Sequence, residues 1–551
     1  MHRSPALALA AALLATALSA GVRTAGAQAV TGLGEDATTV GARRVRLSIG
    51  GDWSLAQDEY VPDGKGGYVL RPLGAALTLD TLGATQIGAV RSLQDSLRAA
   101  AGSSALRLSL GQSATRVNQT ITRVPVTLEA GLARWLSIGV TVPFVHTIAD
   151  VFFATNGSGS NLGANPARTD ATAFATDTAL VQQLARSASA IASYCGGAGA
   201  GSASCSGSTA LVASTRAFSA EIGSVYAAGG LAPTQTSTVQ AQIDARIASV
   251  KSAVNAFAAI PGSGVPSVSA AGVVAAATPA TTQDVQGFLS DPTLGTGIAP
   301  LGTVDTWHLG DTELNAKLTL FDSFALRGES RFAPRGFNLR AAVSGGFRFP
   351  TGHRGSPDVI LDVPQEEHTS ALLAGGYLDV LLGRHLWASV VARYVHPRAS
   401  DVTVRAGLPG EIIPLAADTV TLSRTLGNVI EIDATPRWVV NDFFSFGGVY
   451  SYVRRNADTY TGSPTLPPSG TTLLGVTGDF SALGAGTEVR EHRVGAGLVF
   501  SNAHAVALGR SRVPFDVSYQ HLETVRVTVG SAPKYVTDRI LVRLYYGREK
   551  R

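Results

Sequence analysis

Residues 124–144 read VPVTLEAGLARWLSIGVTVPF, two alternating stretches separated by the short polar break ARW. In the first stretch Leu128 and Ala130 alternate with Thr127 and Glu129. A period of two residues places successive side chains on opposite faces of an extended strand. The stretch therefore predicts two antiparallel strands joined by a tight turn, each with one apolar and one polar face.

The same alternation recurs to the end of the chain. It is found at residues 44–53, 313–320, 339–349, 430–438, 493–500, 513–520 and 539–546. In a soluble sandwich the apolar face of such strands is buried and the polar face meets water. In a membrane barrel the apolar face meets lipid and the polar face lines the lumen. The alternation alone is compatible with both architectures.

Three further features favour the barrel. The polar faces carry charges of both signs, as expected where side chains meet within a confined lumen. Aromatic residues lie near the strand ends, where membrane barrels have girdles: Phe144, Phe349, Trp438, Phe444, Tyr450, Tyr452 and Tyr546. Connections also alternate in length, with short ones expected at 133–135, 321–323, 383–384, 441–442 and 501–502 and long ones at 149–305, 351–369, 399–425 and 456–487.

These patterns predict an all-β transmembrane antiparallel β-barrel of about 14 strands (±2), with an α-helical, Ala/Ser-rich insertion. The sheet is expected to close into a barrel, because an open sheet edge in lipid leaves a row of backbone groups without hydrogen-bond partners. An even strand number places both chain ends on the periplasmic side. We expect the barrel to be a monomer with the lipid bilayer of the outer membrane as its partner.

Composition excludes several other classes of protein. The chain has 551 residues, of which 45% are apolar and 15% charged, with a formal net charge of +4. No run of about 20 apolar residues follows residue 25, so spanning helices are not expected. Apolar residues are too plentiful for disorder. The 44 basic and 40 acidic residues are interspersed, which argues against nucleic acid as a partner.

The first residues have the form of a secretory signal peptide. A short basic start precedes an Ala/Leu run over 6–20, and two overlapping A-x-A sites follow at 25–29. We expect residues 1–27 to be removed after Ala27, with Ala29 as the alternative, and the mature chain to reach the bacterial outer membrane after Sec-type export. The structural alternative is a buried N-terminal helix.

The mature chain divides into three parts. Residues 28–149 and 305–551 carry the strand pattern, whereas 150–304 form a low-charge insertion with five basic and six acidic residues between 151 and 300. Helical spacing replaces alternation there, with helices expected at about 171–194 and 209–228 and on the stripe Val239, Ile243, Ile247, Val250 and Val254. The insertion is predicted either to cap the barrel outside or to plug its lumen.

A shorter helix is expected at about 87–101, where Ile87, Val90, Leu93 and Leu97 share one face. It is interpreted as a periplasmic connection or as a helix at the pore mouth. Both helical pieces are interpreted either as passive packing elements or as parts of a gate or of a substrate funnel.

The two cysteines, Cys195 and Cys205, lie in a Gly/Ser-rich stretch of an exported chain. An isolated pair in an oxidising compartment predicts one disulfide. A metal site is not expected, because no CxxC motif or nearby histidine accompanies the pair.

Motifs of catalysis are missing from the sequence: it contains no HExxH, GxSxG, GxGxxG or Walker loop. We therefore expect no enzyme activity, no cofactor and no metal. His146, His396 and His521 lie near strand ends, where an outer-membrane lipase would need a Ser–His pair, and are interpreted as structural.

Charged residues on the polar faces are the candidates for lining the lumen. They are Arg44, Arg46, Arg123, Glu129, Glu313, Lys317, Arg340, Arg348, Asp379, Arg393, Glu431, Asp433, Arg437, Arg493 and Arg543. The alternative for each of them is an internal salt bridge that helps to fill a closed barrel.

Three short landmarks carry a family resemblance: residues 126–144, GDTELNAK at 310–317 and FRFPTG at 347–352. They resemble the outer-membrane barrel family labelled for the meta-pathway of phenol degradation, which is similar in architecture to the long-chain fatty-acid transporter superfamily. The likeness covers 123–148 and 305–400, and the long insertion is a departure from the family pattern. The resemblance implies a monomeric barrel that admits hydrophobic compounds.

Together the residues and the resemblance predict a passive channel or uptake porin for small apolar or aromatic molecules. The alternative is a structural or surface-interaction protein of the outer membrane, whose helical insertion binds a partner while the barrel anchors it.

Overall fold

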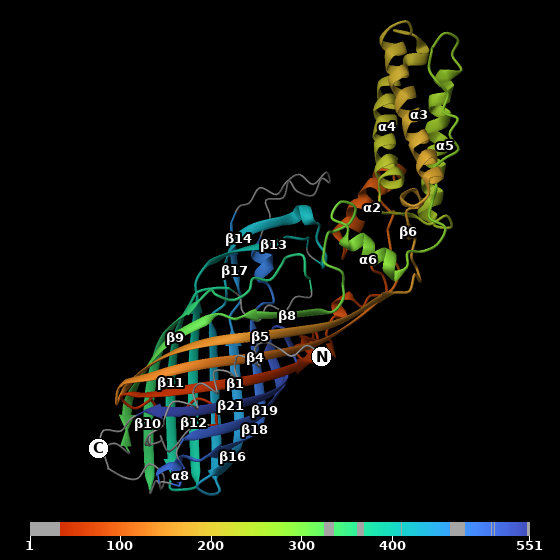
Figure 1. Cartoon of the computed structure of the whole chain (residues 1–551). Coiled ribbons are helices and arrows are strands. Elements are labelled where there is room, and N and C mark those ends of the chain that lie inside the picture. Colours follow the sequence, from red (N-terminus) through yellow and green to blue (C-terminus); the bar gives the residue numbers. More distant parts are fainter. Residues whose placement is uncertain are drawn as a thin grey trace.

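The computed structural model describes residues 33–323, 336–360, 368–408, 410–462, 480–507, 510–511 and 513–547. Within this part of the chain, twelve antiparallel strands pair in a ring and close a barrel (Figure 1). The signal peptide expected at residues 1–27 lies outside the described residues.

The barrel strands follow the chain around the ring, so that almost every strand pairs with its neighbour in sequence. They are β1 (Arg44–Ala56), β4 (Ser113–Ala133), β5 (Leu136–Thr155), β9 (Thr312–Asp322), β10 (Phe337–Phe349), β11 (Ala371–Leu382), β12 (Leu386–Pro397), β15 (Val429–Val439), β16 (Phe444–Arg455), β18 (Val489–Ser501), β19 (Phe515–Val529) and β21 (Val536–Gly547). β21 pairs with β1 and closes the barrel. An additional strand, β8 (Val304–Leu309), pairs with the distal part of β5.

The transmembrane barrel predicted from the sequence is confirmed, with twelve strands in the described chain against the expected 14 ± 2. Two of the five short connections are longer than expected. The connection from β9 to β10 runs from Asp322 to Phe337, and α8 (Ala503–Ala507) lies between β18 and β19. The turns from β4 to β5, from β11 to β12 and from β15 to β16 are short, as predicted.

The outer face of the barrel is apolar, as a lipid-facing surface requires. Leu128, Leu320, Phe446 and Leu498 expose 48% to 60% of their surface. So many large exposed apolar side chains on neighbouring strands exceed what a soluble protein leaves in contact with water. The polar positions of the same strands point inward.

The two ends of the barrel differ in the length of their connections. One end carries the β4–β5, β11–β12 and β15–β16 turns and both termini of the strand ring. The opposite end, called the loop end below, carries all the long connections expected at 149–305, 351–369, 399–425 and 456–487. β4 and β5 have 21 and 20 residues, about twice the length that a bilayer requires, and they extend far past the loop end (Figure 1).

The insertion between β5 and β8 is helical, as predicted, and it stands beyond the barrel at the loop end (Figure 1). α3 (Ala171–Gly196), α4 (Ser208–Ile222) and α5 (Thr238–Ala258) form an elongated bundle. The predicted stripe Val239, Ile243, Ile247, Val250 and Val254 is buried in its core. A single π-type turn (Gly223–Ala227) follows α4.

Two further helices form the foot of this bundle (Figure 1). α2 (Gly88–Ala101) buries Val90 and Leu97 in the same apolar core as α4 and α5, and α6 (Thr282–Ser290) packs beside β5. The interpretation of 87–101 as a periplasmic connection is wrong, because α2 belongs to the β1–β4 connection at the loop end. None of the described helices is long and apolar enough to cross a bilayer.

Short strands complete the loop end. They form three small sheets: β2 (Asp58–Pro62), β3 (Tyr68–Pro72) and β20 (Ala532–Pro533); β13 (Ser400–Arg405), β14 (Thr419–Thr425) and β17 (Thr459–Thr461); and β6 (Leu162–Ala164) with β7 (Leu231–Pro233). The expected disulfide joins Cys195, near the end of α3, to Cys205, just before α4.

Candidate functional site

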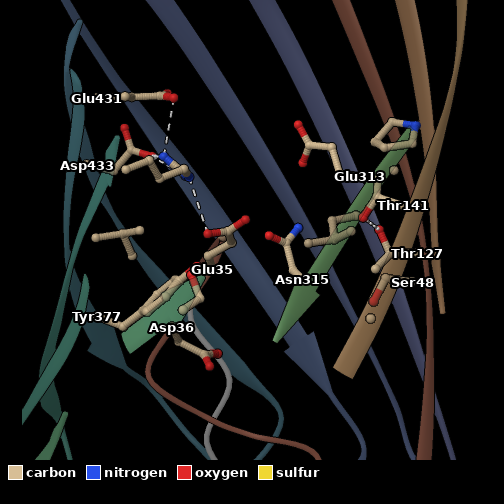
Figure 2. Close-up of a pocket in the computed structure, with 18 of the residues that line it drawn as sticks. Glu35, Asp36, Ser48, Thr127, Thr141, Glu313, Asn315, Tyr377, Glu431 and Asp433 are labelled. Atoms are coloured by element: carbon tan, nitrogen blue, oxygen red, sulfur yellow. Dashed lines mark hydrogen bonds and ion pairs between the residues drawn. The ribbon is translucent and has the colours of Figure 1, made fainter. Parts of the chain in front are cut away.

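The barrel encloses a cavity of about 450 Å³. Its wall is made of inward side chains from most strands of the ring, and a part of it is shown in Figure 2. A volume of this size matches sites that hold small molecules. The cavity is therefore the candidate functional site.

Charged side chains on the inner face of the barrel, in and around the cavity, form ion pairs between strands that are direct neighbours. Each pair joins two residues that face each other in the strand register, a position at which opposite charges stabilise a sheet. The pairs are Arg46–Glu129 (2.5 Å), Arg348–Glu313 (2.7 Å), Arg340–Asp379 (2.6 Å), Arg539–Asp52 (2.9 Å) and Arg543–Asp516 (3.1 Å). The charges are thus matched along the wall rather than across the lumen.

Arg393 on β12 is the centre of a larger cluster. Its guanidinium lies 2.7 Å from an oxygen of Asp433 and 3.4 Å from one of Glu431, both on β15. A third carboxylate, that of Glu35, approaches its Nε to 3.3 Å from the opposite side (Figure 2). Three carboxylates therefore share one arginine at the edge of the cavity.

Glu35 belongs to a segment that the strand pattern did not place. Residues 33–41 precede β1, have no strand pairing and run through the lumen toward the end opposite the loops. Leu33 and Val40 are fully buried, and Asp36 is 3% exposed. We call residues 33–41 the lumen segment; its residues 34–36 form one side of the cavity.

Side chains from around the ring hold the lumen segment. The backbone carbonyls of Leu33, Gly34 and Asp36 accept hydrogen bonds from Gln520, Arg543 and Lys317, which lie on β19, β21 and β9. Further along, the Ala37 N–H donates to Asp379 on β11 (3.0 Å), and the Thr39 hydroxyl bonds to that of Thr319 (2.9 Å).

Apolar packing adds to these bonds. Leu33 packs with Val449, Val499 and Leu522 in a small cluster on three strands. β18 has a glycine at 497, and a Cβ there would collide with the Leu33 side chain. The wall is therefore shaped to receive this segment.

Most of the predicted lumen residues lie around the cavity. Ten of the fifteen line it: Arg46, Glu129, Glu313, Lys317, Arg348, Arg393, Glu431, Asp433, Arg493 and Arg543. Arg340, Asp379 and Arg437 lie deeper, away from the cavity, and the Arg437 guanidinium stacks 4.8 Å from the centre of the Trp387 ring.

The remaining two predicted residues lie outside the cavity wall. Arg123 faces Asp52 in the β1–β4 register, and Arg44 begins β1 beside Gly547.

The cavity wall also has an aliphatic side. Leu373, Val391, Val395 and Val429 line it from the neighbouring strands β11, β12 and β15. On the opposite strands the lining is hydroxyl-rich, with Thr127 and Thr141 joined by a 2.9 Å hydrogen bond (Figure 2). The cavity therefore offers apolar and polar surface together.

Several lining residues were missed by the sequence pattern. Glu35 and Asp36 precede the first alternating stretch, and Asp52, Tyr377 and Arg539 were not selected from theirs. Tyr377 faces the cavity and carries the Lys317 ammonium 3.7 Å above its ring centre. Glu35 and Asp36, two acidic residues soon after the expected signal peptide, were the feature of the sequence that could have indicated the lumen segment.

The histidines near strand ends lie on the outer face of the barrel. His146 stacks on Trp307 and lies 2.6 Å from Asp305, and His521 lies 2.9 Å from Asp538. Tyr519 donates to the same Asp538. Among the described residues, no group of three or more His, Cys, Asp or Glu is arranged to hold a metal ion.

No protein-family model matches the chain, and no curated protein matches it. Among solved structures, alignments cover nearly the whole chain at low similarity. They include the COG4313 outer membrane channel from Pseudomonas putida F1 (8% identity, 93% of this chain and 97% of that one, TM-score 0.37) and the Ralstonia pickettii toluene transporter TbuX (8%, 94% and 93%, 0.28). A Pseudomonas aeruginosa FadL homologue aligns with 8% identity over 95% of this chain and 96% of that one, with a TM-score of 0.24.

Proposed function

We propose that the chain is an outer-membrane channel for the passive passage of small, largely apolar or aromatic molecules. The observation that carries the proposal is the cavity inside a closed barrel, bounded on one side by the lumen segment. That segment is held by side chains of the wall and not by strand pairing. Its displacement would open a path without breaking the hydrogen bonds that close the barrel.

The lining narrows the class of solute. A purely polar solute would leave the aliphatic side formed by Leu373, Val391 and Val395 in contact with polar groups. A hydrocarbon would displace water from the charged side without replacing the hydrogen bonds of that water. A small molecule with an apolar or aromatic body and one polar group satisfies both sides. Aromatic alcohols and acids belong to this class.

Solute flux into liposomes tests this proposal. The full chain is reconstituted and the entry of benzyl alcohol, benzoate and a pentose of similar size is compared with that in protein-free liposomes. We expect protein-dependent flux that is faster for the aromatic solutes than for the sugar. No protein-dependent flux of any of the three would contradict the proposal.

A pair of adjacent valines on β12 provides a matched control. Val391 is 3% exposed and lines the cavity, whereas Val390 faces outward and is 39% exposed. Val391→Thr keeps the shape and adds a hydroxyl to the aliphatic side, so it should slow aromatic flux severalfold. Val390→Thr makes the same chemical change on the outer face and should leave the flux unchanged.

A second candidate function is attachment of a partner to the helical bundle, with the barrel as the anchor. The observation in its favour is that α3, α4 and α5 project away from the barrel (Figure 1). Binding of a partner by the intact protein, lost when residues 171–258 are replaced by a short Gly/Ser linker while flux is kept, would favour this function.

A further inference from the structure

Four basic residues lie on the outer face of the barrel near the loop end, on the strands β16, β18 and β19. These strands are direct neighbours in the barrel (Figure 1). Arg454 and Arg490 face each other directly in the β16–β18 register. His492 and Arg526 face each other in the same way between β18 and β19. We call these four residues the outer basic cluster.

The outer basic cluster contrasts with the lumen wall. Inside, arginines such as Arg348 and Arg543 face a carboxylate across the register, whereas here like charges occupy facing positions. Two cations placed directly opposite each other destabilise a sheet unless an anion lies between them. Among the described residues, no ion pair joins Arg454, Arg490 or Arg526 to a carboxylate.

The acidic side chains near the cluster do not neutralise it. Glu523 on β19 pairs with Lys534 at 2.7 Å, and Glu491 points inward, where it pairs with Arg493. Glu488 lies two residues before Arg490, and within the described chain it makes no ion pair with any of the three arginines. The outer basic cluster therefore carries a net positive charge that lacks a counterion within this part of the protein.

The depth of the cluster in the membrane is fixed by its neighbours along each strand. On β18 the outward residues run from Leu498 (48% exposed) and Val494 (42%) to His492 and then Arg490. On β16 they run from Phe446 through Tyr450 and Tyr452 to Arg454.

The basic residues thus begin where the apolar belt ends. Tyr450 and Tyr452 stand at this border, and the Tyr450 hydroxyl lies 2.8 Å from Nδ1 of His492. Tyrosines of this kind mark the headgroup level of a bilayer.

We propose that the outer basic cluster binds the phosphate of an anionic lipid headgroup in the leaflet at the loop end of the barrel. Guanidinium groups bind phosphate in bidentate fashion, and Arg454, Arg490 and Arg526 supply three of them on three neighbouring strands. The acyl chains of the same lipid would lie along Val494 and Leu498. This inference goes beyond the proposed channel function, because the site lies on the outer face and not in the lumen.

Binding of defined lipids to the full chain tests the proposal. The purified protein in detergent is titrated by native mass spectrometry with dioctanoyl phosphatidic acid, with dioctanoylglycerol and with inorganic phosphate. We expect the phosphatidic acid to bind, the uncharged lipid not to bind, and inorganic phosphate at equal concentration not to displace the bound lipid. Equal binding of both lipids, or displacement by phosphate alone, would overturn the proposal.

Charge-removing variants locate the site. Each basic residue near the membrane surface contributes about 1 kcal/mol to the free energy of binding an anionic lipid headgroup. Arg454→Gln, Arg490→Gln and Arg526→Gln together should therefore weaken binding by roughly 100-fold. The matched control is Arg186→Gln, Arg216→Gln and Arg246→Gln, which removes the same charge from the helical bundle and should change binding less than about twofold. Unchanged binding in the first triple variant would refute the site.

Folding is checked by the heat-dependent mobility of the barrel on gels. If the triple variant fails to fold, Arg526→Gln alone is used, and it should weaken binding about fivefold. Aromatic flux should be unchanged in the folded variants, so a failure of lipid binding is distinguishable from a failure of the channel.

Discussion

Two regions of this chain are candidates for filling the barrel, and the smaller one does so. The insertion between β5 and β8 has about 150 residues, and it stands outside the barrel (Figure 1). The lumen segment has nine residues, and it runs through the barrel. The size of an insertion therefore does not decide whether it occupies a lumen.

The chemistry of the two regions explains the difference. Helices α3, α4 and α5 bury their apolar stripes against each other, so the insertion has a core of its own and few charges to offer a charged wall. The lumen segment has no core, but its backbone carbonyls and its two carboxylates match the arginines and the lysine of the wall. Complementarity of charge and hydrogen bonding, and not apolar area, selects what fills a polar lumen.

The largest expected effect is a difference in conductance between two deletions, one of each region. Deletion of residues 33–40 removes one side of the cavity together with the groups that occupy the lumen, and it should raise the conductance of the channel in planar bilayers severalfold. Replacing residues 171–258 by a short Gly/Ser linker should leave the conductance close to that of the intact chain, because the bundle lies outside the lumen. The opposite pattern would show that the bundle controls the path.

Much of the barrel was predictable from alternation, because a strand with one face in lipid and one in the lumen repeats every two residues. The register pairs Arg46–Glu129 and Arg348–Glu313 lie on the polar faces that this alternation selected. The number of strands was less well determined. A local pattern does not show where one strand ends and the next begins, as with the end of β9 at Asp322 and the start of β10 at Phe337.

The lumen segment was not predicted, and the physical reason is its irregular backbone. Residues 33–41 have neither a helical nor an alternating pattern, and their contacts reach residues as distant as Asp379 and Arg543. Besides the two acidic residues themselves, a second and indirect signal existed. The inward residues selected from the sequence comprise ten basic and only five acidic ones, an imbalance that requires an acidic partner such as Glu35 or Asp36.

Removal of the disulfide tests whether the stability of the bundle is independent of the barrel. Cys195 and Cys205 close a loop with a sequence separation of 10 between α3 and α4. Removing the link by Cys195→Ser and Cys205→Ser should destabilise the bundle by about 2 to 3 kcal/mol, chiefly because the unfolded chain gains entropy. Helical circular dichroism during thermal unfolding measures the loss.

Solute flux at room temperature should be unaffected by this change, because the link lies far from the cavity. Reduced flux in the cysteine-free variant would show that the bundle and the path are coupled.

The smallest expected effect concerns a buried carboxyl group in the bundle. Asp177 on α3 is fully buried; its Oδ1 accepts a hydrogen bond from the Val274 N–H at 2.7 Å, and its Oδ2 has no partner among the described residues. Burial raises the pKa of Asp177 to about 6, and the Val274 N–H opposes the shift. The folded bundle therefore binds this proton more tightly than the unfolded chain does.

The sign of the pH dependence follows from that difference. Because the pKa is higher in the folded state than its usual value of 3.8, the bundle gains stability as the pH falls from 7 through 6, and the gain is complete near pH 4. Between pH 7 and pH 5 the free energy of unfolding should rise by about 1 kcal/mol, measured by chemical unfolding of the helical signal. Asp177→Asn mimics the protonated group and should remove this dependence, whereas Asp170→Asn, at the exposed N-cap of the same helix, should leave it in place. If the wild-type bundle instead loses stability over this interval, the buried carboxyl group is charged in the folded state and must have a partner that compensates its charge.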